Sequence, residues 1–161
     1  MPLISIRGLT DEDCRQLAAM LCEDDILRRD LGIPEDRKST AEAFARFICE
    51  WERERNASTY AIVLDGDTAV GTISLSHVDL VERSGRIGYW VGSDYRKKGH
   101  CTEAFGRVVE EAVSRGLERV RASIAEENIP SRRIWERHGG RVVCCEDGKI
   151  AYEIELDGKP S

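Results

Sequence analysis

The sequence predicts an α+β fold in which one mixed sheet of about seven strands has helices on its faces. Short segments rich in β-branched and aromatic residues recur along the chain, and glycine-containing turns join several of them as antiparallel hairpins would be joined. Two other such segments are separated by a helix of about four turns, which predicts a crossover between neighbouring parallel strands. With 161 residues, 41% of them hydrophobic, the chain suits a single domain spanning residues 1–161.

The first 55 residues predict one strand and two helices. Residues 3–8 alternate briefly and are rich in β-formers, so they predict a strand, and Thr10 is a suitable N-cap for a helix with an acidic first turn. Residues 22–38 are acidic and contain glycine and proline, which predicts an irregular, mobile loop. The second helix is expected after Thr40. Its expected buried stripe consists of Ala43, Phe44, Phe47, Ile48 and Trp51.

A hairpin and a central strand are expected next. Residues 59–64 and 69–75 are strand-like and flank a turn that contains Gly66, which predicts an antiparallel pair. Residues 87–91 are apolar at successive positions, so this strand is expected to be buried on both faces.

The remaining elements complete the sheet. Residues 102–115 have apolar positions at helical spacing, and the strand expected at 120–124 should lie parallel to the central strand. A short helix is expected over residues 131–138. Residues 141–145 and 150–156 then predict a closing hairpin.

The segment between the central strand and the following helix has the composition of an anion site. Arg96, Lys97 and Lys98 supply positive charge, and Gly99 lets the backbone approach a ligand closely. The helix that follows begins with unpaired N–H groups, which bind phosphate well. The order of these parts therefore predicts a site for a polyphosphate.

Three segments resemble motifs of the GNAT superfamily of N-acetyltransferases, in particular the branch that includes the ribosomal-protein alanine acetyltransferases. They are residues 87–91, residues 95–104 and residues 128–140. The resemblance covers nearly the whole chain and implies a mostly antiparallel sheet, splayed at its middle, with helices on both faces. It also implies transfer of an acetyl group from acetyl-CoA to a primary amine by direct attack in a ternary complex.

The resemblance assigns coenzyme A contacts to particular positions. The pantetheine arm would pair with the backbone of the central strand, and Asn128 and Ser131 would lie near the pantetheine and the thioester. The central strand's contributors are Tyr89, Trp90 and Val91. The pyrophosphate would lie against Arg96, Lys97, Lys98, Gly99, His100, Cys101 and Thr102. Cys101 departs from the small residue that is usual at the end of this loop motif.

Two further departures affect the chemistry. Relatives often have a tyrosine that serves as general acid where this chain has Trp135, so Ser131 is the expected acid, with helix capping as its alternative role. Arg86 occupies a position that often carries a glutamate base. Tyr89 could contact the leaving group.

A general base must therefore come from elsewhere in the chain. Glu82 is the candidate, with Asp79 and His77 as alternatives, unless the amine arrives neutral and needs no base. The three histidines are scattered without ligand spacing, so no metal is expected.

Charge and composition restrict the partners. A net charge of −6 supports neither nucleic-acid nor membrane binding. The six cysteines lack paired spacing, and no long apolar segment occurs, which predicts reduced thiols and a cytoplasmic protein. The expected acceptor is an amine-bearing small molecule or a protein N-terminus. Acidic groups at residues 23–25, Asp30, Glu35 and Asp36 could attract it.

Three matters stay open at this level. The chain could be a coenzyme A-binding module that has lost turnover, because Trp135 and Arg86 stand where catalytic residues often occur. It could also be an acyltransferase that uses a longer acyl group. A homodimer is an open alternative to a monomer.

Overall fold

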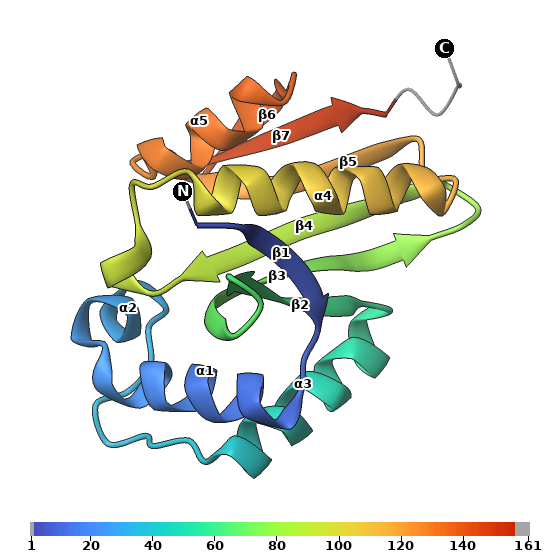
Figure 1. The fold of residues 1–161 in the computed structure, drawn as a ribbon. Helices are drawn as coiled ribbons and strands as arrows, with labels where there is room; N and C mark the ends of the chain where they lie inside the picture. The colour runs from blue at the N-terminus through green and yellow to red at the C-terminus, as the bar shows by residue number, and fades with distance from the viewer. Residues whose placement is uncertain (1, 157–161) are drawn as a thin grey trace.

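A computed structural model describes residues 2–156 as one open seven-stranded sheet with helices on both faces (Figure 1). The strands lie in the order β1-β2-β3-β4-β5-β7-β6. They are β1 (Ile4–Gly8), β2 (Ser58–Leu64), β3 (Thr68–Asp79), β4 (Ser84–Val91), β5 (Arg119–Ala125), β6 (Arg141–Glu146) and β7 (Lys149–Glu155). The predicted strands and their order along the chain are confirmed.

The helices divide between the two faces of the sheet. They are α1 (Asp11–Glu23), α2 (Asp25–Asp30), α3 (Ala41–Arg55), α4 (His100–Ser114) and α5 (Ile129–Arg137), with the 3-10 turn η1 at Ser93–Tyr95. Helices α1 and α3 pack together below the sheet in Figure 1, whereas α4 and α5 lie over its other face. The α4 helix connects β4 to β5 as the crossover pattern predicts.

Strands β4 and β5 are paired over only a short length. Their parallel ladder joins Ser84, Gly85 and Arg86 to residues 119–121, and it stops there. All other neighbouring strands within residues 2–156 pair antiparallel. The sheet is therefore mostly antiparallel and splayed at its middle, as expected from the family resemblance.

Two apolar cores hold these layers together. The larger core lies under α4 and α5, where Phe105, Trp135 and Tyr152 are almost fully buried. The smaller core joins α1 and α3 through Leu17 and Phe44. Aromatic side chains of this size contribute much of the stabilisation because each removes a large apolar area from water.

Three expectations about burial and local structure are wrong. Strand β4 is not buried on both faces, because Arg86 and Gly88 are exposed beside the point where β5 diverges. Phe47 is 60% exposed, because only part of the apolar stripe of α3, including Phe44, packs against the rest of the protein. The segment 22–38 contains helix α2 and is not wholly irregular.

Buried Arg28 connects helix α2 to the end of α1 and to the loop after α2. Its guanidinium donates hydrogen bonds to four backbone carbonyls that surround it. They belong to Leu21 at 2.6 Å, Pro34 at 2.7 Å, Glu35 at 3.3 Å and Arg37 at 2.9 Å. Hydrogen bonds from a charged donor are stronger than neutral ones. One side chain therefore provides partners for backbone carbonyls of a loop that belongs to no sheet.

Candidate functional site

The N-terminus of α4 has free backbone donors. Thr10, Asp24, Thr40 and Asn128 cap the other α-helices within residues 2–156 with their side chains, whereas Gly99 at the N-cap of α4 offers none. Gly99 has φ of +80°, which suits glycine and turns the chain sharply into the helix. The first N–H groups of α4 are therefore available to an anion.

The three cations before this helix play different parts. Arg96 donates to Asp30 of α2 at 2.7 Å and to the carbonyl of Val91 at 3.3 Å, so it ties the loop to its surroundings. Lys97 and Lys98 are exposed and form no ion pair within residues 2–156. The two lysines are consequently the loop cations best placed to meet phosphate.

The next residues enter the helix and contribute mainly backbone. His100 as a whole is only 6% exposed, so its ring is packed within the protein and is not a free surface group that could bond a phosphate. Cys101 is half-buried, and burial raises the pKa of its thiol to about 12. A neutral thiol is a weak nucleophile, so Cys101 fits a packing role better than a covalent one.

The second part of the site is the unpaired edge of β4. Beyond Arg86 no strand within residues 2–156 pairs with β4 on its β5 side. This stretch contains Tyr89, Trp90 and Val91. Strand β3 pairs with the opposite edge of β4 and leaves the edge on the β5 side free. Because backbone groups of a strand alternate between its two neighbours, part of this stretch presents donors and acceptors to the gap. Amide groups of a pantetheine arm could pair with them, so these residues fit coenzyme A.

Ser131 lies in the first turn of α5, beside Tyr89 of β4. Its hydroxyl lies 2.5 Å from the Tyr89 hydroxyl, and it is partly exposed. Asn128 caps α5 by accepting a hydrogen bond from the Ser131 N–H at 3.3 Å. The capping role therefore belongs to Asn128, and the Ser131 hydroxyl is left for Tyr89 and a ligand.

Tyr89 sits in an apolar environment that keeps it protonated. Its ring packs edge-on against Phe105 with centroids 6.1 Å apart, and Phe105 packs against Trp135 at 5.0 Å. Burial raises the pKa of the Tyr89 hydroxyl to about 12, although Ser131 and the indole of Trp135 oppose the rise. The site thus holds neutral hydroxyls at pH 7, which can give hydrogen bonds or protons to a developing negative charge.

The fold does not bring Glu82 to this site. Glu82 is exposed in the turn between β3 and β4, where its N–H donates to Asp79 at 3.0 Å and its carbonyl accepts from Arg119 at 2.8 Å. The chain rises about 17 Å from Ser84 to Tyr89 at the usual spacing of a strand. Neither Glu82 nor Asp79 is therefore near Ser131.

His77, the remaining candidate base, lies at an irregularity in β3. It is exposed, with φ of +52°, and its Nδ1 is 2.9 Å from the Ser76 hydroxyl. Burial of part of the ring and the nearby charge of Arg86 lower its pKa, so it is neutral at pH 7.

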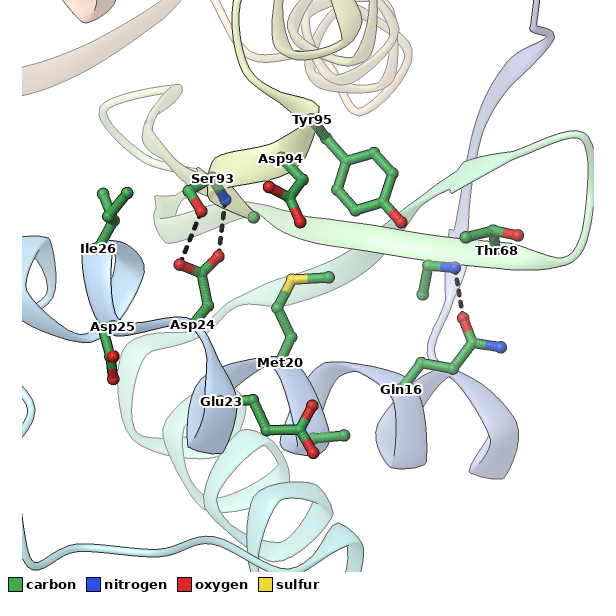
Figure 2. Close-up of a pocket in the computed structure, with 13 residues that line it drawn as sticks. Gln16, Met20, Glu23, Asp24, Asp25, Ile26, Thr68, Ser93, Asp94 and Tyr95 are labelled. Atoms are coloured by element: carbon green, nitrogen blue, oxygen red, sulfur yellow. Dashed lines mark hydrogen bonds between the residues drawn. The ribbon is translucent and has the colours of Figure 1, made fainter.

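A cavity of about 680 Å³ lies between α1, α2, the start of β3 and η1. Figure 2 shows Met20 rising from α1 toward Tyr95, while Asp24 accepts two hydrogen bonds from Ser93 at 2.7 Å. Asp24 and Asp30 are therefore already paired within the protein, with Ser93 and Arg96 respectively. Three other acidic residues line the cavity: Glu23, Asp25 and Asp94.

Three contacts in and around this site were not predicted from the sequence. They are the Tyr89–Ser131 hydrogen bond, the Arg96–Asp30 ion pair and the Asp24–Ser93 pair. Each joins residues more than forty positions apart, and no local pattern marks such pairs. The loop at residues 96–102 and Ser131, by contrast, were predicted as site residues from short motifs.

Replacing Gly99 with valine is expected to weaken coenzyme A binding about 10-fold. No other atom lies within 4 Å of the added Cβ, so the change strains the backbone at φ +80° without a clash. An L-residue in this conformation costs roughly 1–2 kcal/mol, and relief of the strain would turn the first N–H groups away from phosphate.

Gly116 provides a matched control for calorimetric titration. It has φ of +83° and equally open surroundings at the other end of α4. Gly116→Val should lower the melting temperature similarly and leave the affinity unchanged. Equal affinities for both variants and the unaltered protein would contradict the loop assignment.

The residues that the structure describes contain no cluster of metal ligands, no membrane-spanning helix and no disulfide. Within residues 2–156 there is no group of three potential metal ligands, and each helix is too short or too polar to span a bilayer. All six cysteines belong to this part of the chain and are unpaired.

Comparisons with known proteins agree with this geometry. A family model described as "Acetyltransferase (GNAT) domain" matches residues 4–141. "Putative ribosomal N-acetyltransferase YdaF" of Bacillus subtilis (strain 168) is 29% identical over 160 residues, which cover 96% of this chain and 85% of that protein. The resemblance to this family and to its ribosomal-protein branch is confirmed.

Solved structures share the fold. The crystal structure of a "Probable acetyltransferase" is 27% identical, has a TM-score of 0.77, and matches over 95% of this chain and 93% of its own. Mycobacterium smegmatis RimJ in complex with CoA-disulfide is 22% identical and has a TM-score of 0.82, over 100% of this chain and 88% of that one. The chain therefore belongs to the GNAT acetyltransferase family and is an acetyl-CoA-dependent N-acetyltransferase.

Proposed function

We propose that the protein transfers the acetyl group to a primary amine by direct attack in a ternary complex, with Ser131 giving a proton to the leaving thiolate. The observation that carries this proposal is the stretch of β4 beyond Arg86, which pairs with no strand on its β5 side within residues 2–156 and whose Tyr89 contacts the Ser131 hydroxyl. The uncapped start of α4 lies at the end of the same strand. One extended ligand with a phosphate at one end could contact all three.

The proposed chemistry places few demands on the side chains. The amine nitrogen bonds to the carbonyl carbon, the C–S bond breaks, and its electron pair remains on sulfur, which takes the proton of Ser131. The proton lost by the amine passes to water, and the Ser131 hydroxyl regains one from solvent. Positioning of both reactants supplies much of the rate in such a complex. Glu82 has no part in this scheme because of its distance from Ser131.

We propose a protein N-terminus as the acceptor. The name of the Bacillus subtilis relative supports a ribosomal protein as the bearer of that amine. A small cationic amine is the second candidate, and the exposed Glu23, Asp25 and Asp94 around the cavity favour it.

Thiol release from acetyl-CoA tests these alternatives directly. Peptides with a free α-amine are expected to release thiol, whereas the same peptides with a blocked α-amine should not. Polyamines as the better substrates would favour the second acceptor.

Intersecting initial-rate plots are expected for a ternary complex, and parallel plots would contradict direct attack. Tight coenzyme A binding without release on any amine would instead identify a binding module. Faster turnover with longer thioesters would identify a different acyl group.

A further inference from the structure

Two hydroxyl groups meet beside the unpaired stretch of β4. The Tyr89 hydroxyl lies 2.5 Å from the Ser131 hydroxyl, and Ser131 is its only hydrogen-bond partner among residues 2–156. The Tyr89 side chain is half-buried and packs against Phe105. Buried polar groups in native proteins nearly always have partners, so the hydrogen of the Tyr89 hydroxyl needs an acceptor here.

The surroundings of the two hydroxyls favour Tyr89 as the donor. Among residues 2–156 the Tyr89 hydrogen has no acceptor other than the Ser131 oxygen, whereas Ser131 is partly exposed and can turn its own hydrogen toward solvent or a ligand. The Ser131 oxygen then accepts, and its own hydrogen is free to point toward another acceptor.

We propose that Tyr89 is a positioning residue, which donates to the Ser131 oxygen and so directs the Ser131 hydrogen into the gap between β4 and β5. This inference rests on the proposed role of Ser131 as the acid. The Tyr89 hydrogen bond also strengthens as Ser131 gives up its proton, since hydrogen bonds to a charged oxygen are roughly twice as strong as neutral ones.

The packing around Tyr89 suits such a role. Its backbone is fixed opposite Ile73 of β3, and its ring is held edge-on by the buried Phe105. Burial also keeps its hydroxyl protonated to about pH 12, so it donates across the whole range of an activity assay. Cys101, a titratable neighbour, is neutral over most of the same range.

Kinetics of Tyr89→Phe, Ser131→Ala and the double variant test the inference. Phenylalanine keeps the ring and removes only the hydroxyl. Tyr89→Phe is expected to lower kcat about 10- to 100-fold, the usual effect of losing a hydrogen bond to a charged group. KM for acetyl-CoA should stay within about twofold, because Tyr89 contributes backbone to the cofactor site.

The double variant separates positioning from packing. If Tyr89 acts through Ser131, Tyr89→Phe lowers kcat no further once Ser131 is alanine. Multiplied effects of the two changes, or a loss confined to KM, would overturn the inference. Unchanged kcat in Tyr89→Phe would do the same.

Tyr60 offers a matched control. Tyr60 lies on β2, and its hydroxyl accepts a hydrogen bond from Arg115 at 2.9 Å. Tyr60→Phe therefore removes a tyrosine hydroxyl outside the site and should leave kcat unchanged. Failure of the proposed function would appear differently, as a wild-type protein that releases no thiol with any amine. A normal kcat in Ser131→Ala, with acetyl transfer intact, would overturn both the acid assignment and the positioning role of Tyr89.

Discussion

Replacing Ser131 with alanine is expected to lower kcat by about 10²- to 10⁴-fold, the range that a positioned general acid contributes. The hydroxyl lies 2.5 Å from that of Tyr89, on the stretch of β4 where we propose that the thioester binds. Its loss leaves the departing thiolate without a proton donor. Coenzyme A affinity should change by less than about twofold, because the ligand's main contacts are to backbone and phosphate-binding groups.

Folding should be nearly unaffected by the same change. Asn128, and not Ser131, caps α5, so Ser131→Ala removes no cap. Steady-state kinetics, calorimetric titration with coenzyme A and a melting curve measure the three quantities. Ser114→Ala is a suitable control, since that hydroxyl donates only to the Glu111 carbonyl at 2.8 Å near the end of α4. An unaltered kcat in Ser131→Ala would exclude the serine as acid.

Replacing Gly71 with alanine is expected to destabilise the fold by about 3 kcal/mol, at the upper end of the usual range for overpacking. A Cβ at Gly71 would lie 2.1 Å from the Trp90 carbonyl oxygen and 2.8 Å from the Cα of Val91. Both are backbone atoms of β4, so a side-chain rotation cannot relieve the contact. Strands β3 and β4 must separate where Gly71 pairs with Val91.

The same separation should affect ligand binding. Trp90 and Val91 belong to the edge of β4 that is assigned to the pantetheine arm, so coenzyme A affinity should fall together with stability. A loss of about 3 kcal/mol corresponds to a melting temperature lower by roughly 6–12 °C in a domain of this size. Thermal unfolding and calorimetric titration provide the measurements.

Gly8 supplies the comparison for this variant. It also lies in a strand, β1, but a Cβ there would meet no atom within 4 Å. Gly8→Ala should therefore shift the melting temperature only slightly and leave coenzyme A binding intact. A Gly71→Ala protein with unchanged stability would show that the two strands can relax without cost.

Local sequence patterns were sufficient for most of the fold. The hairpin of β2 and β3, the crossover through α4 and the closing hairpin of β6 and β7 all followed from alternation, helical periodicity and glycine turns. Helix α2 was missed because its six residues are too few to form a stable helix alone. It depends on the Asp24 cap and on Arg28, whose carbonyl partners extend to position 37.

Local patterns also predicted the burial of β4 wrongly. Residues 87–91 are apolar enough for a strand covered on both faces, yet β5 leaves the ladder after three pairs, and Gly88 is exposed. The extent of pairing depends on how two strands and the layers over them pack. That is a property of the whole sheet, and periodicity in one strand does not encode it.

By itself, the sequence determined the family, the α+β architecture and the loop before α4, because short motifs, side-chain periodicity and the conformational freedom of Gly99 operate over a few neighbouring residues. Only the tertiary structure decided that Tyr89 meets Ser131, that Asp30 holds Arg96 and that Glu82 lies at the far end of β4. These contacts depend on strand register and on the packing of α2 and α5 against the sheet. Residues far apart in the chain come together only when the complete core has formed.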